Sequence, residues 1–409
     1  MNIRSAVVTH TTLASLNERY LQAIKMFGDS DNPDDQEKLA NLMRPLLVLG
    51  KPGIGKTVSV REFAKKKYKI GYKEVRLASV ESLDLGGLPL VEEGPDGARF
   101  TAYAVSKLLP NAERDGECGV LVFDEITSCE PSARRATLKL FDSDRGINDY
   151  KLPPKWFCIA LGNDVDDGGE GVEPLSGAFV NRFRCLRLEP DYASWEVWAD
   201  ERGINSSVMA FLKCYPELFY VEPVEGDVRI CASPRAWEGV AAQLDFAETL
   251  EGGRVDASNT EMFMACIASD VTPDIAARFA AFYAYNAEML DPEEVLSGKA
   301  KLNGKDAGAK ESVYLTIESC IALLIKRTKG IEVSKLTAEM QSQIGNFIRF
   351  TGQLQAAKGG EAAVSALEQL VRRVPASAGL LGGATFKKNF PEEYKLLVYT
   401  ASKLTGINR

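Results

Sequence analysis

The chain has 409 residues, 45% of them hydrophobic and 26% charged, which is enough for two or three folded domains with a large core. Its formal charge of −8 argues against a long nucleic-acid tract as the main partner. No apolar run approaches the roughly 18 residues of a membrane helix, and the first residues, MNIRSAVVTH, lack the apolar segment of a signal peptide, so we expect a cytoplasmic protein.

Cysteine and histidine usage narrows the chemistry further. The eight cysteines include no C-x-x-C pair, which argues against a zinc site or a disulfide framework and favours a reducing compartment. His10 is the only histidine, which argues against a histidine-dependent catalytic triad or metal centre. We expect the cysteines to be small buried hydrophobic residues; they are Cys118, Cys129, Cys158, Cys185, Cys214, Cys231, Cys266 and Cys320.

Apolar runs alternate with helical patterns over the first 190 residues. Short, nearly continuous apolar or β-rich runs are typical of strands that are buried on both faces of a parallel sheet. Helical patterns between them predict an α/β fold with three layers, α, β and α, around a five-stranded parallel sheet. The predicted strands are Leu46–Leu49, Glu74–Ala78, Val120–Phe123, Phe157–Leu161 and Cys185–Leu188.

Almost all of the remaining chain shows helical periodicity. We therefore predict a nucleotide-binding core over 1–190, with amino-terminal helices, a helical lid over 191–290 and a helical extension of the lid over 291–409. A segment rich in Gly, Ala and Lys, Ser297–Lys310, is predicted to be a loop. The predicted helices are Val208–Cys214, Ala236–Leu250, Ile275–Met289, Val313–Arg327 and Ala338–Leu354.

The stretch Gly50–Thr57 matches the phosphate-loop pattern G-x-x-x-x-G-K-[ST] without a mismatch. It follows an apolar strand and opens a helix, the context in which backbone N–H groups converge on phosphate oxygens. We expect Lys56 to reach the β- and γ-phosphates of ATP, and Thr57 to bind Mg²⁺. The residues predicted to contact ATP are Gly50, Pro52, Gly53, Ile54, Gly55, Lys56, Thr57 and Val58.

A second apolar strand, in GVLVFDEI, ends in Asp124 and Glu125. Asp124 is predicted to hold Mg²⁺ through water, and Glu125 to polarise the water that attacks the γ-phosphate. A switch GTPase would carry Asp-x-x-Gly here and Asn-Lys-x-Asp downstream, and this sequence has neither.

Four further polar residues are candidates for the site. Asn163 ends the strand WFCIALGN, at the strand end where ligands collect in open α/β sheets, and could orient the attacking water. Arg182 and Arg184 stand just before the last strand, and either could reach a neighbouring subunit's γ-phosphate, although a surface arginine paired with an acid is the alternative for both. Arg235, at the start of a helix in the lid, could close on the same phosphate, although a solvated arginine is the alternative.

This order of motifs resembles the AAA+ ATPases: a phosphate loop, a strand ending in Asp-Glu, a polar strand end, Asn-Arg-Phe and Ser-Pro-Arg. Two predicted hairpins, in SVESLDLGGLPLVEEGPDGARFTAY and DSDRGINDYKLPPKW, resemble the MoxR branch of that family. The segments Gly162–Gly171 and Trp195–Gly203 resemble MoxR-like ATPases that work with von Willebrand factor A domain proteins. Asp164 departs from the Asn-Pro that often ends the third strand in this branch.

The resemblance implies an ATPase with Mg²⁺ and a ring of six identical subunits, in which Arg182 serves the neighbour's nucleotide. It also implies mechanical work on a protein client, with a von Willebrand factor A domain protein as partner. Two alternatives remain: a nucleic-acid-directed AAA+ ATPase, such as a loader or transposition regulator, and a regulatory module that binds ATP but hydrolyses little. The sequence shows neither a basic groove nor an appended DNA-binding helix pair, which the first alternative would require.

Overall fold

The computed structural model describes residues 5–164, 174–222, 232–252, 255, 265–302, 310–332, 335–357, 360–380 and 383–405. It divides into two compact units, Met1–Ser194 and Trp195–Arg409. No helix in the described ranges combines the length and apolarity needed to cross a membrane. Cys231, residues 165–171 of the resemblance and residues 303–309 of the predicted loop lie outside the described residues.

The first unit is built on a parallel sheet of six strands in the order β1-β10-β2-β9-β6-β3. All five residues of β2, LLVLG, are buried, as expected for a central strand with helices on both faces. The strands of this sheet are β1 (Ala6–Val8), β2 (Leu46–Gly50), β3 (Gly71–Arg76), β6 (Gly119–Asp124), β9 (Trp156–Gly162) and β10 (Arg184–Leu188).

The prediction of five strands missed the edge strand β1. Its three residues, AVV, are too few for a recognisable pattern, and Ala6 and Val7 are exposed. The predicted boundaries of the second strand were also wrong, because β3 begins at Gly71 and the chain turns into a 3₁₀ segment at Leu77–Ser79. Most of this edge strand is only partly buried, so its polar residues hid the pattern.

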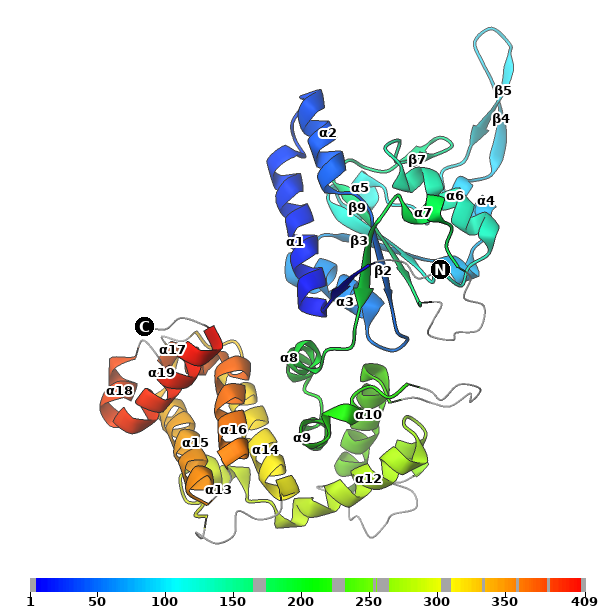
Figure 1. Ribbon diagram of the computed structural model, residues 1–409. Helices are drawn as coiled ribbons and strands as arrows, with labels where there is room; N and C mark the ends of the chain where they lie inside the picture. The colour runs from blue at the N-terminus through cyan, green and yellow to red at the C-terminus, as the bar shows by residue number, and fades with distance from the viewer. Residues whose placement is uncertain are drawn as a thin grey trace. The chain divides into compact units, whose positions relative to one another are not determined.

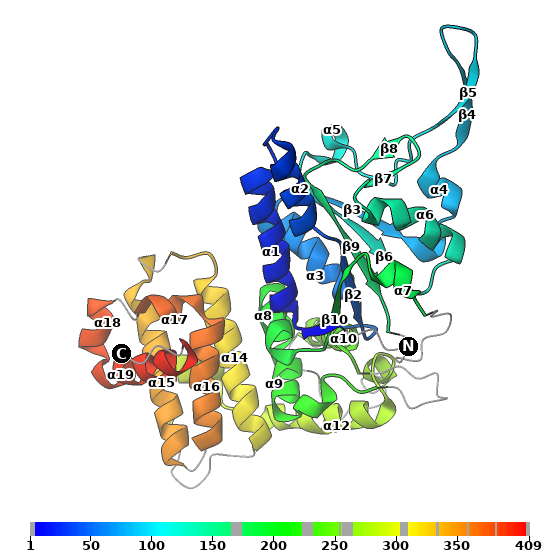
Figure 2. The same ribbon diagram turned by 45° about the horizontal axis from the view of Figure 1, so that its top comes forward.

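Helices cover both faces of the sheet (Figures 1 and 2). The α1, α2 and α3 helices lie on one face, and α4, α6 and α7 lie on the other. On this second face, three aromatic rings of α6 and of the segment around α7 contact one another: Phe141, Phe179 and Phe183. The helices are α1 (His10–Phe27), α2 (Pro33–Leu42), α3 (Lys56–Glu62), α4 (Ser82–Gly86), α5 (Ala112–Asp115), α6 (Pro131–Phe141) and α7 (Gly177–Val180).

Both predicted hairpins are present. The first, β4 (Pro89–Glu93) with β5 (Arg99–Tyr103), projects away from the sheet (Figures 1 and 2). The second consists of β7 (Gly146–Ile147) and β8 (Tyr150–Lys151). The turn of the second hairpin holds the base of the first, because Asn148 Nδ2 donates to Gly86 O at 2.8 Å.

Helices make up the described part of the second unit. The predicted helix Ile275–Met289 is shorter than expected, because α12 ends at Ala284 and a 3₁₀ segment follows to Glu288. The helices are α8 (Tyr192–Arg202), which begins in the first unit, α9 (Ser206–Cys214), α10 (Pro234–Glu251), α12 (Pro273–Ala284), α13 (Pro292–Leu296), α14 (Lys310–Thr328), α15 (Ala338–Ala356), α16 (Gly360–Arg373), α17 (Pro375–Leu380), α18 (Ala384–Asn389) and α19 (Pro391–Thr405).

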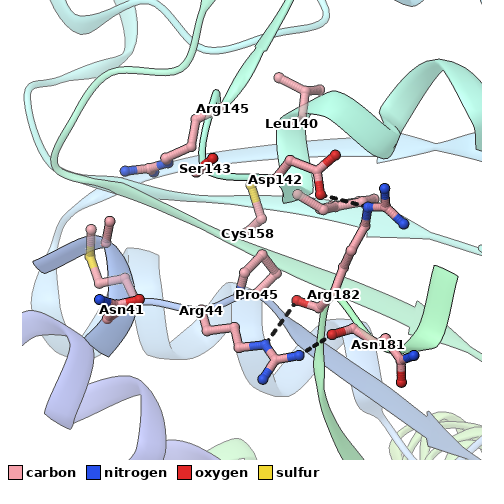
Figure 3. Close-up of a pocket in the computed structure, with 13 residues that line it drawn as sticks. Asn41, Arg44, Pro45, Leu140, Asp142, Ser143, Arg145, Cys158, Asn181 and Arg182 are labelled. Atoms are coloured by element: carbon pink, nitrogen blue, oxygen red, sulfur yellow. Dashed lines mark hydrogen bonds and ion pairs between the residues drawn. The ribbon is translucent and has the colours of Figure 1, made fainter. Parts of the chain in front are cut away.

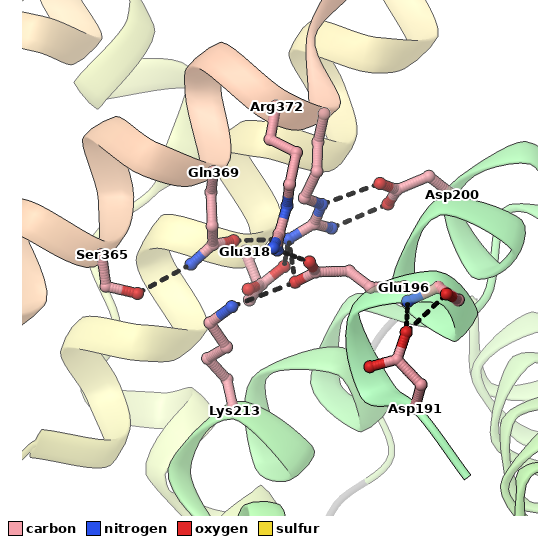
Figure 4. Close-up of polar contacts among 10 residues, drawn as sticks. Asp191, Glu196, Asp200, Lys213, Glu318, Ser365, Gln369 and Arg372 are labelled. Carbon is pink, nitrogen blue, oxygen red and sulfur yellow. Dashed lines mark hydrogen bonds and ion pairs between the residues drawn. The ribbon is translucent and has the colours of Figure 1, made fainter. Parts of the chain in front are cut away.

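A buried group of charged side chains joins four helices of this unit (Figure 4). Arg373 on α16, with a side chain only 1% exposed, donates to Asp200 on α8 at 2.7 Å and to Glu318 on α14 at 2.6 Å. Lys213 on α9 lies 3.2 Å from the buried Glu196 on α8. We call this group the Arg373 cluster; its members are Glu196, Asp200, Lys213, Glu318, Arg372 and Arg373.

Candidate nucleotide-binding site

The phosphate loop connects the end of β2 to the start of α3. Gly53 and Gly55 adopt left-handed backbone conformations, with φ of 76° and 87°, which favour glycine. Gly50 is restricted for another reason: a Cβ there would lie 2.5 Å from the backbone oxygen of Leu188 on β10. The loop leads directly into α3, and the N–H groups and dipole at the amino end of a helix favour phosphate.

The Lys56 side chain links two strand ends. Its Nζ donates to the backbone oxygens of Gly50 and Lys51, both at 2.8 Å, and to Asn163 Oδ1 at 2.9 Å. Since β2 and β9 are neighbours in the sheet, Asn163, directly after β9, meets the phosphate loop. The predicted lysine and the predicted polar strand end are thus brought together.

The two predicted magnesium ligands also meet. Thr57 Oγ1 donates to Asp124 Oδ2 at 2.7 Å, and Asp124 Oδ1 accepts the backbone N–H of Glu125 at 2.9 Å. A hydroxyl and a carboxylate are the hard oxygen ligands that Mg²⁺ prefers, so these residues fit the ion. In the described ranges, no group of three or more His, Cys, Asp or Glu side chains is placed to hold a metal. A magnesium ion here would therefore need phosphate or water oxygens as further ligands.

Glu125 leaves the strand with an unusual backbone. Its φ is 61°, in the left-handed region that residues other than glycine seldom adopt, and its side chain is 44% exposed. Such strain is concentrated at functional sites. The carboxylate lies 4.0 Å from Nε of Arg76 at the end of β3, so it is accessible and has a cation nearby. The sequence analysis assigned no role to Arg76.

Two more residues at this edge of the sheet escaped the sequence analysis. Thr127, which is buried, accepts the backbone N–H of Asn163 at 3.1 Å and so fixes the end of β9. His10, at the start of α1, lies beside the phosphate loop, since a Cβ on Gly55 would be 3.9 Å from its Cε1. Burial lowers the pKa of His10, and the nearby charge of Lys56 acts in the same direction. The signal for His10 was its position as the first residue of α1, two residues after the end of β1, the strand that was missed.

Arg182 and Arg184 lie at the amino ends of the parallel strands, opposite the strand ends that carry the phosphate loop. Arg184 pairs with Leu46 and Leu188 pairs with Gly50, so the length of β10 separates these arginines from the phosphate loop of their own chain. Four residue steps along a strand span about 13 Å. Neither arginine is therefore placed to contact a nucleotide in its own loop.

The two arginines have different partners. Arg184 donates to the backbone oxygens of Leu42 at 3.0 Å and Asn41 at 3.1 Å, and its guanidinium lies over the ring of Tyr20. Arg182 donates through Nε to Asp142 Oδ1 and through Nη1 to the backbone oxygen of Ala178, both at 2.6 Å. Arg184 thus closes the carboxyl end of α2, whereas Arg182 keeps Nη2 without a hydrogen-bond partner among the described residues.

Arg235 stands in the first turn of α10, is exposed and belongs to the second unit. Ser233 caps this helix by accepting the N–H of Ala236 at 3.3 Å, and Pro234 follows the cap, which explains why the sequence Ser-Pro-Arg begins a helix. The role of Arg235 toward the γ-phosphate stays a prediction.

One family model and several solved structures are similar to parts of this chain. Residues 45–183 match the family model described as AAA domain, dynein-related subfamily. Similar solved structures include a closed-state cryo-EM reconstruction of Hsp104 with ATPγS and FITC-casein, at 18% identity over 44% of this chain and 34% of that chain, with a TM-score of 0.28. A RuvB P216G mutant from Thermotoga maritima is 16% identical over 71% of this chain and 76% of that chain, with a TM-score of 0.37. A candidate ATPase from Cytophaga hutchinsonii is 13% identical over 70% of this chain and 93% of that chain, with a TM-score of 0.26.

These TM-scores are low, and this chain covers only 34% of the Hsp104 chain, so the assignment is based on the family model and the site. The matched range contains the phosphate loop, Asp124, Glu125, Asn163 and Arg182. It also contains the strands β2, β3, β6 and β9 of the sheet. Residues 45–183 of this chain therefore match an AAA domain, and the first unit has the α/β phosphate-loop fold of such domains.

Proposed function

We propose that this chain is an ATP-hydrolysing ring motor of the MoxR type that remodels or activates a protein partner. One observation carries the proposal: Lys56 with Asn163, and Thr57 with Asp124, meet at the carboxyl edge of the sheet, next to Glu125. The family match over this range supports ATP hydrolysis. This set can bind a nucleoside triphosphate, hold a divalent cation and activate a water.

Each side chain has a distinct task in this proposal. Lys56 exchanges neutral acceptors for the β- and γ-phosphate oxygens, while Thr57 and Asp124 hold Mg²⁺. Bound Mg²⁺ would neutralise charge on the phosphate oxygens. Glu125 accepts a proton from the attacking water, and Asn163 orients that water. The exposed Glu125 carboxylate is accessible to solvent water in this role.

The position of Arg182 supports the proposal of a ring. A guanidinium at the amino ends of the strands cannot reach a nucleotide in the phosphate loop of the same chain, which lies at their carboxyl ends. It could serve the loop of a neighbour, and such head-to-tail contacts close into a ring. We propose a hexamer, as the MoxR resemblance implies, with each active site shared between two subunits.

The β4–β5 hairpin is our candidate surface for the protein partner. It carries exposed apolar side chains: Leu90 is 48% exposed, Val91 76% and Phe100 51%. Exposed apolar groups on a projecting hairpin are suited to contact another protein. We propose a von Willebrand factor A domain protein as that partner, on the basis of the resemblance around Trp195–Gly203.

The Glu125→Gln variant tests the proposal. The amide keeps the size of the side chain but cannot accept the proton, so hydrolysis should fall by about 10²–10⁴-fold while ATP stays bound. ATP retention would be measured by rapid filtration, and assembly by light scattering with ATP and Mg²⁺. The matched control is Lys56→Ala, which should not retain ATP. Near-native turnover in Glu125→Gln would contradict the proposed mechanism.

Affinity purification of the ATP-loaded Glu125→Gln protein from its native cell tests the partner. A von Willebrand factor A domain protein recovered with Glu125→Gln but not with Lys56→Ala would support the proposal if the purified partner also changes the ATPase rate of the wild type. DNA recovered in its place, together with ATPase stimulation by DNA, would favour the nucleic-acid-directed alternative. Turnover that remains negligible in the wild type at every protein concentration would favour the regulatory module.

A further inference from the structure

Two side chains outside the recognised motifs hold the Asn181–Arg182 segment (Figure 3). Asp142 Oδ1 accepts Nε of Arg182 at 2.6 Å. Arg44 binds the backbone of the same segment, since its Nε donates to Arg182 O at 3.2 Å and its Nη2 donates to Asn181 O. One contact thus fixes the guanidinium, and the other fixes the peptide that carries it.

Hydrogen bonds, rather than close packing, hold the Arg182 side chain. It lines a pocket of about 310 Å³ together with Arg44, Asp142 and Cys158 (Figure 3). The Arg182 and Asp142 side chains are 31% and 39% exposed. An ion pair with this much exposure contributes little to the free energy of unfolding. We therefore interpret its main effect as the orientation that it gives to the guanidinium.

The orientation suits a phosphate ligand supplied by another molecule. Asp142 occupies Nε, and Ala178 O occupies Nη1, so Nη2 remains to donate outward. An arginine side chain that is already ordered loses less conformational entropy when it binds. Displacement of a reacting or stabilising group by about 1 Å can cost about a hundredfold in rate.

Both holding residues lie close to regular elements of the domain. Arg44 lies between α2 and β2, two residues before Leu46. Asp142 directly follows the last residue of α6, the helix that comes after Asp124 and Glu125 in the chain.

We propose that Asp142 and Arg44 are positioning residues for Arg182. Asp142 sets the direction of the guanidinium, and Arg44 fixes the position of the backbone that carries it. The inference rests on the proposed function, in which Arg182 acts on the nucleotide of a neighbouring subunit. Neither residue touches ATP, so both act only through Arg182.

The test compares the ATPase kinetics of Asp142→Ala, Asp142→Asn, Asp142→Glu and Arg44→Met in the assembled protein. We expect kcat to fall about ten- to a hundredfold in Asp142→Ala and Arg44→Met, with KM for ATP and the melting temperature unchanged. The loss should be smaller in Asp142→Asn, whose amide oxygen can still accept the Nε hydrogen bond. Asp142→Glu should restore part of kcat, because it restores a carboxylate. Asp144→Ala is the matched control, since Asp144 pairs with the exposed Lys151 near the same turn and should leave kcat unchanged.

A double-mutant cycle separates positioning from a general structural effect. If Asp142 acts through Arg182, Asp142→Ala combined with Arg182→Ala should be no slower than Arg182→Ala alone. Mixed assemblies give a second readout: Lys56→Ala subunits carry an intact Arg182 and should restore activity to Asp142→Ala subunits. Additive losses, or no rescue in confirmed mixed assemblies, would overturn the inference.

The same experiment keeps this inference apart from the proposed function. If Arg182→Ala lowers kcat while Asp142→Ala and Asp142→Asn do not, the trans-acting arginine stands and only the positioning role fails. If Arg182→Ala leaves the ATPase rate of the assembly unchanged, the proposed sharing of the active site fails, and the positioning role fails with it.

Discussion

Lys56 in the phosphate loop and Arg373 in the second unit are both cations with several hydrogen-bond partners, but the partners shown among the described residues differ in charge. Lys56 donates to two backbone carbonyls and to the amide oxygen of Asn163. Arg373 donates to the carboxylates of Asp200 and Glu318. Neutral acceptors are easily exchanged for phosphate, whereas carboxylates in a buried cluster are not.

Charge balance explains why the Arg373 cluster is structural. Its acids are Glu196, Asp200 and Glu318, and its bases are Lys213, Arg372 and Arg373, so the formal charges cancel. Burial lowers the pKa of Arg373, but the charges of Glu318 and Asp200 outweigh this effect and raise it. Because the formal charges of these six described members cancel, we interpret the cluster as a structural link between α8, α9, α14 and α16.

The comparison predicts that Lys56 governs ligand binding and contributes little to folding. Lys56→Ala removes two or three charge-assisted hydrogen bonds to phosphate, so ATP affinity should fall by about 10²–10⁴-fold. The melting temperature without nucleotide should change little. Isothermal titration calorimetry with ATP and Mg²⁺, beside a thermal melt without them, measures both quantities.

Lys66→Ala is the control for the loss of one positive charge. Lys66 lies on the segment that continues α3, is 57% exposed and pairs with Glu62. It should leave ATP affinity within about twofold of the wild type, because exposed charges are screened. Unchanged ATP affinity in Lys56→Ala itself would sink the assignment of the phosphate loop.

The opposite behaviour is expected of Arg373→Met. Methionine keeps much of the volume but leaves the buried Glu318 and Asp200 without their cation, which should reduce the free energy of unfolding by about 3–5 kcal/mol. Denaturant unfolding followed by far-ultraviolet circular dichroism measures this loss. Lys395→Met is the control, because its pair with Glu392 is exposed and should contribute no more than about 1 kcal/mol. Equal free energies of unfolding for the two variants would contradict the structural role of the Arg373 cluster.

The same contrast explains what the sequence could predict. The phosphate loop depends on consecutive residues, and Asp124 and Asn163 are found at the ends of apolar strands, so a local pattern contains them. The parallel order of β2 and β9 then brings Lys56 and Asn163 together. Fold class and the central contacts of the site therefore followed from short-range patterns.

Contacts between distant segments could not be predicted in this way. Arg373 and Asp200 are 173 residues apart, Arg44 and Arg182 are 138 apart, and Asp142 and Arg182 are 40 apart. A charged residue in a helical pattern is indistinguishable from a solvated one until its partners are placed. Strand β1 was missed because three residues carry too little periodicity.

The smallest effect on stability is expected at His10, which lies beside the phosphate loop. Because burial lowers its pKa, the folded protein binds fewer protons at His10 than the unfolded chain does at mildly acidic pH. The stability that this neutral histidine contributes is present above the ordinary pKa of about 6.5 and is lost as the pH falls through the lower folded value. His10→Gln, which cannot titrate, should therefore lose less stability than the wild type between about pH 7 and pH 5.

One signal reports this titration directly, since the chain contains a single histidine. The Cε1 proton of His10 in a proton NMR spectrum should titrate below about pH 6.5 in the folded protein, and near 6.5 in urea. Bound ATP would place phosphate charge beside the loop that His10 contacts, which favours the imidazolium and should move the midpoint upward. A midpoint at or above 6.5 in the nucleotide-free protein, or no response to ATP, would show that His10 does not sense the phosphate loop.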